Sequence, residues 1–206
     1  MPTAKILAGV GRFQVYFQEN RELFERLAIR QDPEVLFITC SDSRVVPELI
    51  TSSEAGDLFV VRTIGNIVPP YGTGAIGVGA VVEYAVRHVQ VGHIVLCGHT
   101  DCGGIEALDE HIDLMREPHF ARWIDYARPA KTTIDASGLP EEARHLATVR
   151  KNVLLQLENL RSYDPIREGE RAGTLRLHGW VYHVEIGLVE AYDPENDEWS
   201  PVAAEE

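Results

Sequence analysis

Cysteine and histidine side chains at the ends of two apolar segments are the residues of this sequence best suited to chemistry. Cys40 ends the run VLFITC, and His99 and Cys102 lie in the run HIVLCGHTDCGG. Two thiolates and one imidazole form a mixed sulfur and nitrogen set that suits Zn²⁺. Three protein ligands would leave a fourth coordination position open, as catalytic zinc sites do. The alternative for each cysteine is a buried thiol that only fills the core.

A carboxylate and a guanidinium group follow Cys40 at short spacing. Asp42 could be a fourth metal ligand, a hydrogen-bond acceptor for zinc-bound hydroxide, or an ordinary surface acid. Arg44 can bind a carboxylate through two hydrogen bonds. Such a pair would hold Asp42 away from the metal and leave the fourth position to water. The alternative is an exposed salt bridge in a turn, which contributes little to stability.

Strands and helices that alternate along the chain must position these residues. Continuous apolar runs predict strands over residues 33–40, 57–66 and 93–99. The late segment 174–193 predicts one or two strands joined by a turn. Helices are expected over residues 20–29 (with Asn20 as N-cap), 72–89, 101–110 and 141–160. Residues 117–139 are rich in Pro, Gly, Ser and Thr and match neither pattern.

This alternation predicts an α/β fold with a central, mostly parallel β-sheet flanked by helices. Ligands bind outside the carboxyl ends of the strands in such sheets. Cys40 lies at the carboxyl end of one predicted strand, and His99 and Cys102 lie at that of another. The three candidate ligands can therefore meet at one edge of the sheet. Cys97 lies inside its strand, and we expect a buried, inert thiol there.

The composition excludes several classes of function. The chain has 206 residues and a formal net charge of -13, which argues against nucleic acid or an anionic membrane as a partner. No apolar segment approaches the ~20 residues needed to span a bilayer, and the N-terminus does not read as a signal peptide. Three cysteines do not make a disulfide framework, which favours a cytoplasmic location. We expect one domain over 1–206, with an N-terminal helical arm (1–30) and an acidic tail (193–206).

The motifs CSDSR and HTDCGG resemble the two metal-binding motifs of the β-class carbonic anhydrases. VVRTIGN is similar to a strand end of that family, and LHGWVYHVEIG to its late strand. The resemblance implies a lyase that hydrates carbon dioxide reversibly to bicarbonate and a proton, by attack of zinc-bound hydroxide on CO₂. It also implies one Zn²⁺ per chain, held by Cys40, His99 and Cys102, with Asp42 and Arg44 as the catalytic dyad.

Further residues carry over from the resemblance by position. Gln31 resembles a glutamine that hydrogen-bonds substrate or bicarbonate, and Gly103 the position whose backbone N–H faces the bound anion. Phe59 and Tyr84 resemble aromatic residues that line the pocket and can come from the adjacent subunit. From the residues alone, Gln31 could be a surface residue and both aromatics could be core. The family implies a homodimer or higher homo-oligomer with active sites at the dimer interface.

One subdivision of the family bears on the state of the site. Some bacterial members carry a tryptophan three residues before the first zinc cysteine, where it favours an inactive, Asp-ligated zinc. This sequence has Phe37 there, and it resembles the other subtype, in which Arg44 holds Asp42 and the fourth position stays open. Members of that subtype occur in carboxysomes, in bacterial cytosol and in plastids. Tyr84 and His88 lie four residues apart on one helix face, which makes His88 a candidate proton shuttle or an ordinary surface or interface histidine.

Three alternatives share part of this pattern. A carbon disulfide or carbonyl sulfide hydrolase would keep the zinc site and change access to the pocket. A non-catalytic zinc-stabilised scaffold would fit the loss of Asp42 or Arg44, but both are present. A thiol redox role for Cys40 and Cys102 is disfavoured because the chain has no C-x-x-C motif. With two thiolates nearly cancelling the charge of the ion, we expect activity to rise on the alkaline side of neutrality.

Overall fold

The computed structural model describes residues 2–202 and divides the chain into two units, residues 1–32 and 33–206. The N-terminal unit contains α1 (Pro2–Glu19) and α2 (Arg21–Ile29). Large apolar side chains of α1 are exposed, and they are Ile6, Leu7, Val10, Phe13, Val15, Tyr16 and Phe17.

Asn20 occupies the N-cap position of α2, as predicted, but it does not cap the helix with its side chain. Its amide nitrogen instead donates to the backbone carbonyl of Tyr16 at 2.9 Å. The turn is held by aromatic packing as well, because the ring of Phe24 stacks on that of Phe17 with centroids 4.6 Å apart. The side chain of Asn20 therefore ends α1 rather than starting α2.

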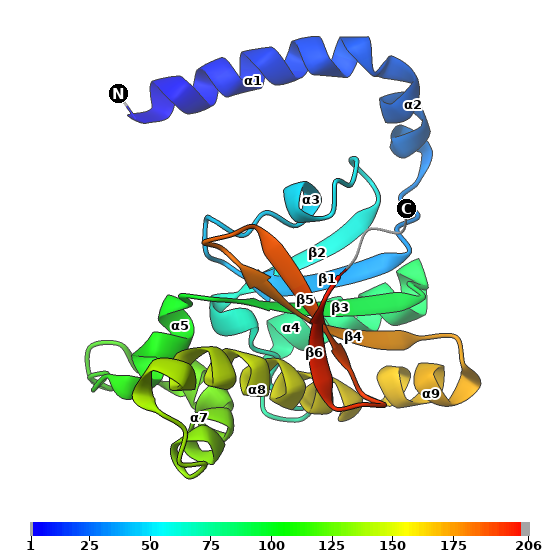
Figure 1. Ribbon diagram of the computed structural model, residues 1–206. Helices are drawn as coiled ribbons and strands as arrows, with labels where there is room; N and C mark the ends of the chain where they lie inside the picture. The colour runs from blue at the N-terminus through cyan, green and yellow to red at the C-terminus, as the bar shows by residue number, and fades with distance from the viewer. Residues whose placement is uncertain (1, 203–206) are drawn as a thin grey trace. The chain divides into compact units, whose positions relative to one another are not determined.

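The second unit is built on a six-stranded sheet with the order β2-β1-β3-β4-β5-β6 (Figure 1). The first four strands in this order run parallel, β5 pairs antiparallel with β4, and β6 pairs antiparallel with β5. This arrangement confirms the predicted α/β fold with a mostly parallel sheet. The strands are β1 (Val35–Cys40), β2 (Leu58–Thr63), β3 (His93–His99), β4 (Arg176–His183), β5 (Leu188–Asp193) and β6 (Glu198–Pro201).

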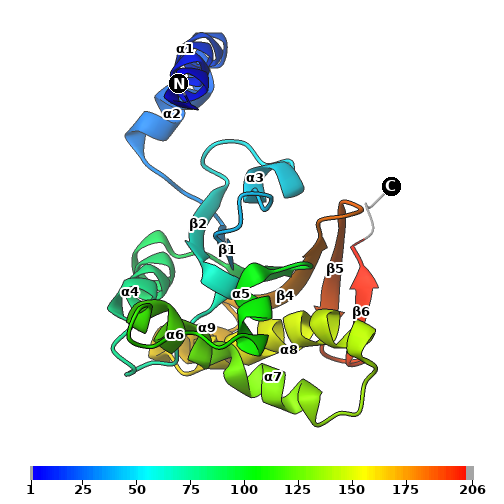
Figure 2. The same cartoon turned by 90° about the vertical axis from the view of Figure 1, so that its left-hand side faces the viewer.

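Helices cover one side of this sheet far more than the other. Figure 2 shows α4 to α9 on one side, with the short helix α3 on the opposite side. Residues 117–139, to which the sequence analysis assigned no element, contain α6 and α7, each with a proline in its first turn. The helices are α3 (Pro47–Ile50), α4 (Ile76–Tyr84), α5 (Gly103–Glu106), α6 (Pro118–Ile124), α7 (Arg128–Asp135), α8 (Glu141–Arg161) and α9 (Asp164–Ala172).

The apolar run of β1 is continuous because both faces of the strand are covered. Leu36 and Ile38 pack into the main core under α4, α5 and α8. Phe37 lies on the other face with Val95 and Cys97. Cys97 is fully buried, and burial raises the pKa of its thiol to about 12. The prediction of a buried, inert thiol at this position is confirmed.

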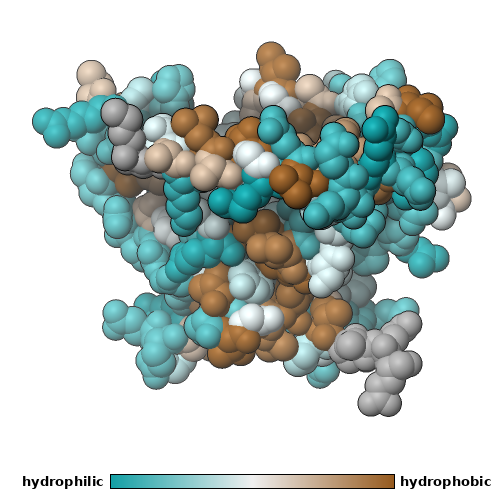
Figure 3. Space-filling view, turned by 90° about the horizontal axis from the view of Figure 1, so that it is seen from above, coloured by the Kyte–Doolittle hydropathy of each residue, from teal (hydrophilic) through white to brown (hydrophobic). Residues whose placement is uncertain are grey.

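The face of the sheet that carries Phe37 is only partly covered within one chain. Several apolar side chains around it are half-buried, and they are Val35, Leu58, Val60, Trp180 and Tyr182. Figure 3 shows apolar side chains gathered on the surface seen from above. Within residues 2–202, no helix is both long and apolar enough to span a membrane.

Candidate active site

The parallel register brings the ends of β1 and β3 together. Thr39 pairs with Cys97, so Cys40 ends its strand beside the last residues of β3. The sulfur atoms of Cys40 and Cys102 lie 3.9 Å apart. These two atoms and a ring nitrogen of His99 all lie within 4.8 Å of one another, and all three residues are buried. The fold therefore assembles the three candidate ligands at the edge of the sheet where ligands are expected.

The orientation of His99 fits a metal ligand. Its Nδ1 lies 2.8 Å from the carbonyl oxygen of Thr100, which can only accept a hydrogen bond, so Nδ1 carries the proton. Nε2 is then the free acceptor, and it is buried with no hydrogen-bond partner in the described chain. A buried, unpaired nitrogen beside two thiols is costly unless a cation satisfies it. The imidazole and the two sulfurs form a donor set that suits Zn²⁺.

The protonation of the two thiols is coupled. A hydrogen bond from Cys102, together with backbone N–H groups of Asp42 and Gly65, lowers the pKa of Cys40 against the opposing effect of burial. The pKa of Cys102 is raised, first by its bond to Cys40 and then by burial. The first thiolate therefore forms readily, and the second proton is held until a cation takes its place.

The predicted pair of Asp42 and Arg44 is present beside the cluster. Nε of Arg44 donates to Oδ1 of Asp42 at 3.0 Å, and Nη2 donates to Oδ2 at 2.8 Å. The backbone N–H of Arg44 also donates to Oδ1 at 2.9 Å. These bonds hold the pKa of the Asp42 carboxyl well below its usual range. Asp42 therefore stays ionised over the whole neutral range.

Three residues that the sequence analysis did not single out also contact the site. Arg62 of β2 donates from Nε to the carbonyl oxygen of Cys40 at 3.0 Å. Asp101 accepts hydrogen bonds from Arg44. Nε2 of His145 on α8 accepts the backbone N–H of Cys102 at 3.3 Å. Arg62 and Asp101 lie inside the motifs VVRTIGN and HTDCGG, but only the fold shows which groups they reach.

The predicted aromatic residues come together, but not at the cluster of their own chain. The rings of Phe59 and Tyr84 stack with centroids 5.9 Å apart, and His88 stacks on Tyr84 at 5.2 Å. Phe59 pairs with Leu36, four residues before Cys40 on β1. That separation along a strand is about 13 Å. The stack therefore lies well away from the metal ligands of the same subunit.

The remaining predicted residues lie in two different places. Gly103 is the first residue of α5, directly after Cys102. A Cβ atom built there would meet nothing within 4 Å in the described chain, so the backbone faces open space. Gln31 lies in the N-terminal unit, after α2, and its side chain is exposed. Its role stays a prediction.

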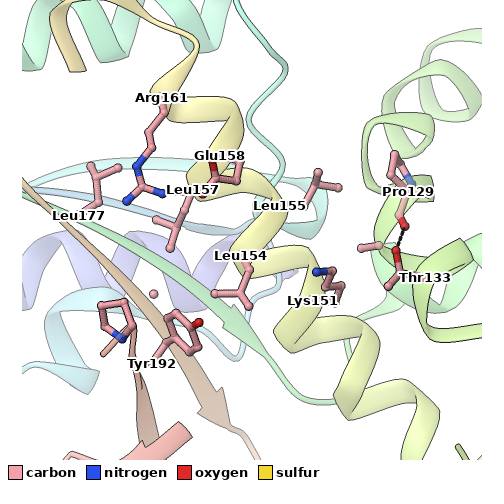
Figure 4. Close-up of a pocket in the computed structure, with 13 residues that line it drawn as sticks. Pro129, Thr133, Lys151, Leu154, Leu155, Leu157, Glu158, Arg161, Leu177 and Tyr192 are labelled. Atoms are coloured by element: carbon pink, nitrogen blue, oxygen red, sulfur yellow. Dashed lines mark hydrogen bonds and ion pairs between the residues drawn. The ribbon is translucent and has the colours of Figure 1, made fainter. Parts of the chain in front are cut away.

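A cavity of about 430 Å³ lies apart from this cluster, between α7, α8 and the strands β4 and β5. Figure 4 shows leucine side chains of α8 pointing into it, with Arg161 and Glu158 beside them. Those two charged groups pair with each other at 2.6 Å. None of the cluster residues lines this cavity, so it plays no part in the site described above.

Comparison with known proteins identifies the family and supports the fold. The carbonic anhydrase family model matches residues 35–189, so the chain belongs to the carbonic anhydrase family. A carbonic anhydrase of Pseudomonas aeruginosa is 47% identical over 190 residues, which cover 91% of this chain and 86% of that protein. One of Synechocystis is 42% identical, with 92% of this chain and 70% of that protein covered.

Solved structures place the chain in the β class of the family. The structure of the β-carbonic anhydrase CcaA superposes with a TM-score of 0.89 at 38% identity, covering 98% of this chain and 92% of that one. A structure of tetrameric β-carbonic anhydrases from Sordaria macrospora gives a TM-score of 0.83 at 30% identity, covering 98% and 99% of the two chains. The chain is accordingly a carbonic anhydrase with a Cys-His-Cys group suited to metal binding.

Proposed function

We propose that Cys40, His99 and Cys102 hold one Zn²⁺ per chain, and that Asp42 and Arg44 are the catalytic dyad of carbon dioxide hydration. One observation carries this proposal. The carboxylate of Asp42, held by Arg44, lies beside a buried cluster of two thiols and an imidazole nitrogen that has no other partner. When bound there, Zn²⁺ would lower the pKa of water so that a nucleophile forms near neutral pH.

Asp42 acts as a hydrogen-bond acceptor at this site. Arg44 bonds to both carboxylate oxygens from one side. The second lone pair of Oδ2 can therefore accept a bond from a proton donor that lies between Asp42 and His99. An ionised carboxylate only accepts hydrogen bonds, so it orients an O–H group and rejects anions that lack a proton there. Arg44 keeps this carboxylate ionised and fixed in orientation.

Substrate and product bind to groups around the dyad. The backbone N–H of Gly103, next to Cys102, would donate a hydrogen bond to an oxygen atom of bicarbonate and stabilise the charge that develops as it forms. By its resemblance to the family's glutamine, Gln31 is proposed as a second hydrogen-bond donor to substrate or bicarbonate. Aromatic rings of Phe59 and Tyr84 supply the apolar wall against which CO₂ lies. The distance of about 13 Å along the strand between Phe59 and the cluster of its own chain supports their contribution from a second subunit.

The working unit is a homodimer or a larger homo-oligomer with the active sites at the dimer interface. Three features support this assembly. The sheet face around Phe37 has half-buried apolar side chains, α1 has exposed ones, and Tyr84 is 46% exposed. Apolar surface of this extent is typical of a surface that a partner covers. The related Sordaria macrospora enzymes are tetrameric.

His88 is the proposed route for the proton released by the reaction. Its ring stacks on Tyr84, so in the dimer it would lie next to the aromatic wall of the partner's pocket. His88 is exposed, so solvent and buffer reach its ring. The thiol ligands require a reducing environment, which supports a cytoplasmic location, free or within a carboxysome-like or plastid-like compartment.

Metal removal and replacement tests the proposed site. Treating the enzyme with a zinc chelator should abolish CO₂ hydration in a stopped-flow assay, and adding Zn²⁺ back at one equivalent per chain should restore it. The chelated protein should remain folded, as judged by circular dichroism, because the main core has many apolar members, such as Leu36, Ile38 and Leu96, that do not bind the metal. Full activity in the metal-free protein would overturn the proposal. Bound zinc without CO₂ turnover would favour carbon disulfide or carbonyl sulfide as the substrate.

A further inference from the structure

The guanidinium group of Arg44 has a second partner besides Asp42. Its Nη1 donates to Oδ2 of Asp101 at 2.5 Å, and its Nη2 donates to the backbone carbonyl of Asp101 at 2.7 Å. We propose that Asp101 is a positioning residue, which holds Arg44 in the orientation that keeps Asp42 off the metal. This inference rests on the proposed function of Asp42 and Arg44.

The fold explains why a second anchor matters. Asp42 and Arg44 lie two residues apart in the loop after β1, so their mutual bonds do not position the pair relative to β3. Arg62 ties this loop to β2, through a bond from its Nη2 to the backbone carbonyl of Asp42. Asp101 follows β3, between the ligands His99 and Cys102. Bonds from one guanidinium group to both loops tie the dyad to the strand end that carries the other two ligands. The planar guanidinium has fixed donor directions, so two anchors define its plane.

The backbone at Asp101 does not by itself require an aspartate. Its φ is 54°, in the left-handed region that glycine adopts most readily and aspartate tolerates. A glycine would make the same turn and keep the carbonyl that Nη2 contacts. The turn therefore does not need the carboxylate of Asp101, which forms a close ion pair with Arg44.

A role for Asp101 in loop stability alone predicts a different result from a role in positioning Arg44. The side chains of Asp101 and Arg44 are 63% and 44% exposed, and ion pairs at that exposure contribute little to stability. If Asp101 only stabilised the loop, its removal would have little effect on any property. If it positions Arg44, its removal lowers the turnover number and leaves the melting temperature and zinc content unchanged.

Asp101→Gly is the direct test, because it deletes the carboxylate without straining the backbone. In the zinc-loaded enzyme we expect kcat for CO₂ hydration to fall by about three- to tenfold, with KM nearly unchanged. Asp101→Asn keeps an oxygen acceptor, so its kcat should fall less than that of Asp101→Gly. The matched control is Asp125→Asn, which removes the carboxylate of another exposed pair, with Arg128 at 2.8 Å. This control should have wild-type kinetics.

Two further measurements test whether Asp101 acts on turnover through Arg44. Modification of Arg44 by phenylglyoxal, followed by peptide mass spectrometry, should be faster in Asp101→Gly than in the wild type. In an Arg44→Ala background, Asp101→Gly should cause no additional loss of kcat, because it acts through Arg44. Wild-type kcat and unchanged Arg44 modification in Asp101→Gly, or equal losses in both backgrounds, would overturn the inference. Failure of the proposed function is distinguishable, since Asp42→Ala would then keep full activity.

Discussion

The Oδ2 atom of Asp42 lies 4.0 Å from Nε2 of His99. This distance is too long for a direct hydrogen bond and short enough for both atoms to contact one small group between them. Arg44 holds the carboxylate from the other side. The relationship explains how a carboxylate can lie beside a metal-binding group without joining it.

Loss of one candidate ligand should weaken metal binding strongly. Replacing His99 by alanine removes the imidazole and leaves only the two thiols as protein ligands. We therefore expect zinc affinity to fall by on the order of 100-fold or more. Zinc content after dialysis, measured by atomic emission, checks this. Cys97→Ala is the control, because Cys97 is equally buried but lies on the other face of the sheet. Stoichiometric zinc in His99→Ala would contradict the assignment.

Cys97 should make stability depend on alkaline pH. Its thiol has a folded-state pKa of about 12, raised from 9.0 by burial. Above pH 9 the unfolded chain loses this proton while the folded chain keeps it. The free energy of unfolding should therefore fall as pH rises, by ~1.4 kcal/mol per pH unit from this group.

The difference between wild type and Cys97→Ala isolates that effect. Urea unfolding at several pH values from about 8 to about 11 should show the two curves converging as pH rises. All other titrating groups are shared and cancel in the difference. A constant difference across this range would show that Cys97 ionises equally in both states.

Two inactive variants should complement each other if the active site spans two subunits. Asp42→Ala lacks the dyad, and Tyr84→Ala lacks part of the aromatic wall. Heterodimers formed by co-expression contain one site that is intact in both respects. We expect activity above the mean of the two separate variants, up to about a quarter of the wild-type value for random pairing.

The control for this experiment pairs Asp42→Ala with Arg44→Ala. Asp42 and Arg44 of one site come from the same subunit, so each site of the heterodimer lacks one member of the dyad. Restoration in this control, or none with Tyr84→Ala, would argue that the aromatic wall comes from the same chain.

Close packing of α8 on the sheet should make Gly98 intolerant of a side chain. A Cβ atom there would lie 2.9 Å from Cγ2 of Val153. Gly98→Ala should lower the free energy of unfolding by about 1–3 kcal/mol, through overpacking, as measured by urea denaturation. Gly77→Ala is the matched control, since a Cβ there meets nothing within 4 Å among the residues that the structure describes. Alanine at that helical position should be neutral or stabilising by about 0.5–1 kcal/mol.

The strand ends could be predicted because apolar runs stop where polar chemistry begins. Cys40 and His99 each end such a run, and a parallel sheet brings those ends together. The short helices α6 and α9 could not be predicted in the same way. α6 has seven residues and α9 has nine, and they bury one and two side chains, so each is too short for an apolar pattern to repeat over several turns. β6 lies in the acidic segment and is held by pairing with β5.

The finer parts of the site depend on tertiary contacts that spacing does not contain. Arg62 reaches the carbonyl of Cys40 only because β1 and β2 pair in one register. Asp101 reaches Arg44 across two loops that are far apart in sequence. The pairing of β1 with β2 also sets the distance between Phe59 and the cluster, which cannot be read from a sequence motif. Sequence patterns therefore locate the metal ligands, and the fold is needed for the residues that orient them.

The most direct measurement is stopped-flow CO₂ hydration by wild type and Asp42→Asn, each with its zinc content determined, from about pH 6.5 to about pH 9. Asp42→Asn keeps the shape of the side chain but removes its charge. We expect one zinc per chain in both proteins and a loss of about 10²- to 10³-fold in kcat for the variant. Because Asp42 stays ionised over this range, the wild-type profile should rise with pH without a step from this residue. A zinc-loaded Asp42→Asn enzyme within twofold of wild type would contradict the central claim.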